Sequence, residues 1–89
     1  MNSAIHFVEL ENRVISATYR NLMIRAKVVL VEKASGMPLP DPVTTITSRM
    51  PNGSLRIRLP EALGPGTYFL LARDAHGKDM TRSMEFEIG

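Results

Sequence analysis

Hydrophobic and polar residues alternate along most of this chain, in short runs that end at Gly, Pro or Asn. The clearest run is 54–59, Ser-Leu-Arg-Ile-Arg-Leu, in which every second residue is apolar. A period of two is that of a β-strand, whose successive side chains point to opposite faces of a sheet. No segment keeps a helical period over about eleven residues. The pattern predicts an all-β chain.

Turn residues separate seven predicted strands. Glu11-Asn12 fits a tight hairpin between the first two, and residues 75–78 fit a second hairpin in which Gly77 has a positive φ. Strands that recur about every 8 to 12 residues, with turns between them, are typical of a β-sandwich or a small barrel. The predicted strands are 5–10, 13–19, 25–33, 43–50, 54–59, 67–74 and 80–88.

Proline decides the course of the segment 34–42, because Pro38, Pro40 and Pro42 each lack a backbone N–H. Such a segment is expected to cross between sheets or to run along a sheet edge. Residues 60–66, which precede the sixth strand, have room for one helical turn.

The length of 89 residues, at 9.9 kDa, predicts a single domain over residues 1–89, because the chain is too short for two hydrophobic cores. With no cysteine, the chain cannot form disulfides or zinc–thiolate sites. Its longest apolar stretches are far shorter than the roughly 20 residues of a membrane-spanning helix, so no membrane insertion is expected. The first residues show no export signal, which predicts synthesis in the cytoplasm without a signal peptide.

Residues 60–89 resemble part of a known family of domains. The Gly66-Thr67-Tyr68 strand, the turn from Asp74 to Gly77 and the closing strand that ends Phe-Glu-Ile resemble the last hairpin of bacterial and viral immunoglobulin-like domains. The resemblance implies an immunoglobulin-like, seven-stranded antiparallel β-sandwich, with the Tyr68 hydroxyl bonded to upstream backbone as in a tyrosine corner. Without the cysteine pair and tryptophan of antibody domains, the chain is more similar to polycystic-kidney-disease-like, fibronectin-like and macroglobulin-like modules. For residues 1–59 the resemblance is one of topology alone.

Residue types suited to catalysis are not brought together by this pattern. His6 and His76 fall on the first strand and at a turn tip, away from any predicted cleft. Asp74 and Asp79 flank one turn, but calcium takes about six to eight oxygen ligands, and Asp74 is expected to accept hydrogen bonds from turn amides instead. The glycines form no phosphate-binding pattern. We therefore expect no enzyme activity, no cofactor and no metal.

Charge and aromatic content argue against a specific nucleic-acid partner, because the net charge is only +2 and there are five aromatic residues. Arg56 and Arg58 project from the same side of one strand and form part of a basic stripe. Strand alternation commonly produces such a stripe on an ordinary solvated face.

An excess of apolar residues on two strands is more informative. If Tyr68 faces the core, then Leu70 does too, and Phe69 and Leu71 face outward. The third strand has the same excess in either phase. The sequence predicts an apolar patch formed by Val29, Val31, Phe69 and Leu71 and rimmed by Lys27, Lys33, Arg73 and Glu85.

Two interpretations of this patch stay open: the segment Met37 to Pro42 folds over it, or it is an interface with a protein partner or further copies of the chain. The interface favours a structural module that docks on a larger assembly, such as a capsid-decoration or tail-attached protein of a phage virion. The alternative is an excised adhesive or carbohydrate-binding domain of a bacterial surface protein or secreted enzyme, located at the cell surface within a longer chain. That function needs exposed aromatic rings, for which Phe69 and Tyr19 are the candidates.

Overall fold

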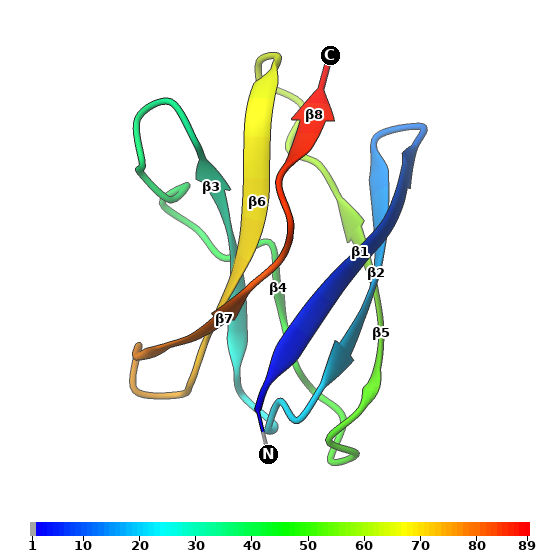
Figure 1. Cartoon of the computed structure of the whole chain (residues 1–89), viewed down its shortest axis with the longest axis vertical. Coiled ribbons are helices and arrows are strands. Elements are labelled where there is room, and N and C mark those ends of the chain that lie inside the picture. The colour runs from blue at the N-terminus through cyan, green and yellow to red at the C-terminus, as the bar shows by residue number, and fades with distance from the viewer. Residues whose placement is uncertain (1) are drawn as a thin grey trace.

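The computed structural model describes residues 2–89 as two antiparallel sheets with no helix (Figure 1). One sheet has the strand order β1-β2-β5, and the other has the order β4-β3-β6-β7, with β8 also paired to β6. The prediction of an all-β chain is confirmed. The strands are β1 (Ala4–Glu11), β2 (Val14–Arg20), β3 (Lys27–Glu32), β4 (Thr44–Thr45), β5 (Gly53–Arg58), β6 (Gly66–Arg73), β7 (Asp79–Arg82) and β8 (Phe86–Ile88).

The hairpin of β1 and β2 closes through Asn12 and Arg13, which have positive φ angles of 52° and 61°. The turn therefore lies one residue later than the predicted Glu11-Asn12, because Glu11 still belongs to β1. Two consecutive positive φ angles define a turn whose twist matches that of the flanking strands. Pairing then shifts by one residue between Phe7 and Glu9, so that Val8 lies in a bulge and is exposed. The bulge keeps the apolar residues on both sides of it directed toward the core.

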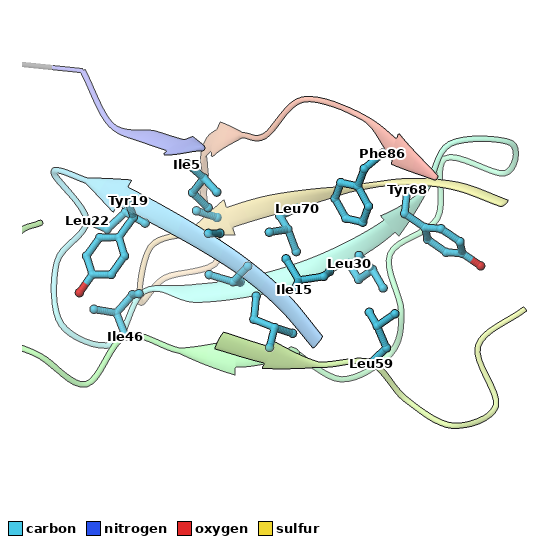
Figure 2. Close-up of a cluster of buried hydrophobic side chains, with 14 of the residues drawn as sticks. Ile5, Ile15, Tyr19, Leu22, Leu30, Ile46, Leu59, Tyr68, Leu70 and Phe86 are labelled. Carbon is cyan, nitrogen blue, oxygen red and sulfur yellow. The ribbon is translucent and has the colours of Figure 1, made fainter. Parts of the chain in front are cut away.

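The two sheets share one hydrophobic core (Figure 2). Ile15 of β2 packs in the same cluster as Leu30 of β3 and Leu70 of β6, and all three side chains are fully buried. Tyr68 is buried in this cluster as well, and its hydroxyl donates a hydrogen bond to the carbonyl oxygen of Gly64 at 3.0 Å. The predicted phase of β6 and the predicted bond of the tyrosine hydroxyl are both confirmed.

The last predicted strand, 80–88, is divided into β7 and β8. Ser83 lies at the break, where its hydroxyl accepts a hydrogen bond from the Leu70 N–H at 2.9 Å and donates one to the Met84 carbonyl at 2.8 Å. Between its pairing with β6 at Arg82 and at Phe86, the chain has one more residue than β6 has. This extra residue breaks the alternation: Met84, which a regular strand would direct to the core with Phe86 and Ile88, is 66% exposed.

The fourth predicted strand is also shorter than expected, because only Thr44–Thr45 pair with β3 as a strand. The proline-rich segment before it follows the edge of β3, where the Leu39 N–H donates to the Leu30 carbonyl at 2.9 Å. This edge course agrees with one of the two expected courses. Residues 60–66 form a turn and not a helical turn.

Loss of the Tyr68 hydroxyl should weaken the fold without opening a cavity. Tyr68→Phe is expected to lower the free energy of unfolding by about 1 kcal/mol, because the hydrogen bond to the Gly64 carbonyl is lost. Urea denaturation followed by circular dichroism measures this change. Tyr19→Phe is the matched control, since the structure shows no hydrogen bond from the Tyr19 hydroxyl within residues 2–89. An equal loss in both variants would contradict the assignment.

Any side chain at position 53 should destabilise the fold, because Gly53 is paired with Tyr19 and a Cβ there would lie 2.7 Å from the Tyr19 hydroxyl oxygen. Gly53→Ala is expected to lower the free energy of unfolding by about 1 to 3 kcal/mol, since the buried ring must shift. Gly64→Ala is the control, because nothing lies within 4 Å of its added Cβ. Equal stability of the two variants in thermal denaturation would refute the proposed close packing.

Candidate interaction surface

The four residues of the predicted patch lie together on the outer side of β3 and β6. In the antiparallel register, Val29 is opposite Leu71 and Val31 is opposite Phe69. The residues that alternate with them in sequence belong to the core cluster: Val28, Leu30, Leu70 and Ala72. Alternation therefore directs the two pairs away from the core. We call these four residues the apolar face.

Exposure within the apolar face is lower than the sequence predicts. Val29 and Val31 are only 5% and 3% exposed, whereas Phe69 and Leu71 are half-buried. The valines are short side chains on a strand with neighbours on both sides, and Pro38 pairs with Val31 from the edge segment. The expectation that all four side chains meet solvent is wrong for the two valines, so Phe69 and Leu71 provide the accessible part.

The proline-rich segment does not produce this burial by folding across the face. Its backbone is bonded to β3 on both sides of Pro38: the Glu32 N–H donates to the Met37 carbonyl at 3.2 Å, and Leu39 bonds to Leu30. Residues 37–39 thus extend the sheet sideways, and Met37 remains 66% exposed. Neither interpretation drawn from the sequence describes the face fully, because it is uncovered by a loop and yet partly buried.

Arg82 contacts the apolar face, which the alternation of the sequence does not indicate. Its guanidinium carbon lies 5.0 Å from the centre of the Phe69 ring, a cation–π contact, and its backbone is opposite Leu71. In a regular last strand Arg82 shares the phase of Phe86 and points inward. The β6–β7 pairing shifts between Ala72 and Arg73, and the chain gains a residue before Phe86, so sequence alternation did not reveal this contact.

Cations at the rim are partly neutralised by acidic neighbours. Arg73 Nε lies 2.9 Å from an Asp79 carboxylate oxygen, and Lys33 Nζ lies 2.9 Å from a Glu85 carboxylate oxygen. Lys27 is opposite Arg73 and forms no ion pair among residues 2–89. Exposed ion pairs contribute little stability, so the rim can exchange these partners for those of a docking surface.

The outer face of the other sheet has a different composition. Its register places Glu9, Ser16 and Arg56 in one row across β1, β2 and β5. A shallow hollow there is lined by Glu9, Glu11, Asn12, Val14, Ser16 and Arg56. Because carboxylates face the arginines across the strands, this surface is a mixed polar face. The two outer faces of the domain are therefore unequal.

The candidate catalytic and metal residues lie apart from one another. His6 is exposed on β1, and His76 is exposed in the β6–β7 turn. Asp74 performs its predicted role, since one carboxylate oxygen accepts from the His76 N–H at 2.8 Å and from the Lys78 N–H at 2.9 Å, and Gly77 has the expected positive φ of 84°. In the described part of the chain, no three His, Asp or Glu side chains are close enough to share a metal ion.

Aromatic rings are not available where a carbohydrate-binding surface needs them. The expectation that Tyr19 is an exposed ring is wrong. Tyr19 is buried in the core, because β2 directs its side chain inward beside Ile5 of β1. Phe69 is half-buried beneath Arg82, and Phe7 stacks on Phe86 with ring centres 4.5 Å apart. No aromatic side chain of residues 2–89 is fully exposed.

Comparison with protein-family models, curated proteins and solved structures finds no match to this chain. The resemblance to immunoglobulin-like domains therefore stays a prediction made from residues and topology. Over residues 2–89 there is no helix of the length and apolarity needed to cross a membrane.

The turn at Asp74 should give the protein a component of acid sensitivity. Hydrogen bonds from the Lys78 and His76 amides hold the pKa of Asp74 below its usual value of 3.8. A lowered folded-state pKa adds stability above the unfolded-state pKa, and this stability is lost as the pH falls through the folded-state value. Asp74→Asn keeps an acceptor oxygen but has no charge. Wild type is expected to be more stable than this variant at about pH 6 and to lose that advantage as the pH falls below the usual carboxyl value of 3.8.

Thermal denaturation across this pH range measures the difference. Asp41→Asn is a control, because Asp41 is an exposed carboxylate outside the turn. A stability difference between wild type and Asp74→Asn that stays constant with pH would contradict the role of the ionised carboxylate.

Proposed function

We propose that this protein is a non-enzymatic structural or interaction module, an immunoglobulin-like β-sandwich that docks on a larger protein assembly through its apolar face. The observation that carries the proposal is the inequality of the two outer faces. Val29, Val31, Phe69 and Leu71 form two adjacent pairs on one sheet, whereas polar and charged rows cover the other. Of these four, Phe69 and Leu71 keep accessible apolar surface, and its burial against a partner would favour association.

The size of the accessible part limits how tightly a single copy can bind. Phe69 and Leu71 are the two anchors, and because both are already half-buried, each would gain less on docking than the roughly 1.5 to 3 kcal/mol of a fully exposed side chain. Two anchors offset only part of the cost of immobilising one small domain. Repeated copies on a regular lattice would increase the apparent affinity by avidity. This requirement favours a repetitive assembly, such as the capsid or tail of a phage virion, with the domain as a decoration or attached protein.

Support for the immunoglobulin-like class comes from three features. The two sheets are antiparallel, β3 pairs with β6, and the Tyr68 hydroxyl bonds to the Gly64 carbonyl in the manner of a tyrosine corner. The divided last strand and the very short β4 depart from a regular seven-stranded arrangement. The carbohydrate-binding alternative lacks a supporting observation, since Tyr19 is buried and Phe69 is partly covered by Arg82.

Site-specific photocrosslinking in the native host tests the proposal, because the crosslink captures whichever molecule lies against the apolar face. Leu71 is replaced by p-benzoylphenylalanine, and the matched control carries the same group at Thr18, which is exposed on the outer face of the other sheet. We expect position 71 to yield one discrete adduct, with a single protein or with a second copy of this chain, and position 18 to yield none. Mass spectrometry identifies the adduct.

A second substitution asks whether the neighbouring ring contributes to docking. Phe69→Ser should reduce the adduct from position 71 by about tenfold or more, because one of the two anchors is removed. The fold should survive, since Phe69 lies outside the core cluster. Equal labelling at positions 71 and 18, or no adduct at either position, would reject docking through the apolar face.

A further inference from the structure

One end of the domain carries exposed apolar side chains on two neighbouring loops. Met23 and Ile24, in the connection from β2 to β3, are 63% and 40% exposed, and Met50, in the connection from β4 to β5, is 68% exposed. Figure 1 shows both connections at the end of the molecule where the described chain begins. We call loops 21–26 and 46–52 together the basic end, for the charges described below.

Backbone hydrogen bonds tie the two loops together. The Leu22 N–H donates to the Pro51 carbonyl at 3.0 Å, and the Arg25 N–H donates to the Ile46 carbonyl at 2.8 Å. The side chains of Leu22 and Ile46 are buried in the core (Figure 2). These two anchors and the cross-links hold the neighbouring apolar side chains outward, so their exposure is built into the loop structure.

Every charged residue of these loops is positive. Residues 12–31 and 42–60 contain no Asp or Glu. Arg25 and Arg49 of the two loops, and Arg20 at the adjoining end of β2, are exposed without an ion pair among residues 2–89. In the nearby β6–β7 hairpin, Asp74 accepts turn amides and Asp79 pairs with Arg73. The basic end therefore presents cations that the domain itself does not neutralise, although the net charge of the chain is only +2.

We propose that the basic end binds the surface of an anionic lipid bilayer. Met23, Ile24 and Met50 enter the interfacial region, while the arginines contact the negatively charged headgroups. A bilayer interface offers apolar and anionic surfaces side by side, which matches the two kinds of side chain found here. Flexible methionine side chains adapt to a fluid surface, and long arginine side chains reach the headgroup level.

The observations favour lipid over nucleic acid, because no aromatic ring lies in either loop to stack on a base. Interfacial binding also differs from membrane insertion, which the short apolar stretches of the sequence make unexpected, since no segment has to cross the bilayer. The basic end uses other elements than the apolar face, so this inference is independent of docking on a protein assembly.

Sedimentation with lipid vesicles tests the proposal on the intact chain. Wild type should bind vesicles with about 30% phosphatidylglycerol at least tenfold more strongly than pure phosphatidylcholine vesicles, and about 0.5 M salt should remove most of this preference. Met23→Ser with Met50→Ser should reduce binding about tenfold. The matched control is Met37→Ser with Met84→Ser, because those two methionines are each 66% exposed but lie outside the two loops.

A charge series separates the contribution of the arginines from that of the methionines. Arg20→Gln with Arg49→Gln should weaken binding to the anionic vesicles, whereas Arg56→Gln with Arg58→Gln, on the outer side of β5, should not. Phe69→Ser should bind vesicles as wild type does, so failure here is distinguishable from failure of protein docking.

Three results would overturn the proposal. The first is that wild type does not bind the anionic vesicles, and the second is that the control methionine pair loses as much binding as the loop pair. The third is binding to polyglutamate but not to vesicles, which would assign the basic end to an acidic protein partner.

Discussion

The pairing of β3 with β6 is the interaction on which the rest of this structure depends. Both strands are apolar almost throughout, so their register decides which residues form the core and which form the apolar face. A shift of one residue would exchange the two sets, because successive side chains point to opposite faces. Tyr68 stabilises the observed phase, since its ring is buried and its hydroxyl reaches the Gly64 carbonyl. The core and the proposed docking surface are thus two sides of one strand pair.

Irregular pairing adjusts this simple scheme at the sheet edges. The bulge in β1 directs Val8 to solvent, and the extra residue between β7 and β8 does the same for Met84. The pairing shift between β6 and β7, together with the extra residue before Phe86, places Arg82 over the Phe69 ring. Bulges on edge strands also discourage uncontrolled pairing with other chains. The irregular pairing is thus found at β1 and β7, whereas β5, the other edge of the β1-β2-β5 sheet, pairs regularly with β2.

The two proposed surfaces differ in shape and charge because they arise from different parts of the fold. The apolar face is formed by regular strands, has few accessible side chains and is bordered by ion pairs. The basic end is formed by loops that buried leucine and isoleucine side chains anchor, and its cations have no acidic neighbours within the loops. A regular face suits contact with a folded protein, whereas protruding apolar and basic side chains suit a fluid anionic surface.

The sequence by itself determined the all-β class, most strand positions, the turn at residues 75–78, the first hairpin turn to within one residue, and the identity of the four residues on the apolar face. These features depend on local alternation and turn chemistry, which act over a few neighbouring residues. Only the tertiary structure decided how far Val29 and Val31 are buried, that Arg82 covers Phe69, and that loops 21–26 and 46–52 form one end. Burial of an outward-facing side chain depends on the strands and segments beside it, which the alternation of the sequence does not specify. A single bulge also reverses the direction of the later side chains in its strand, so their direction cannot be read from a period of two.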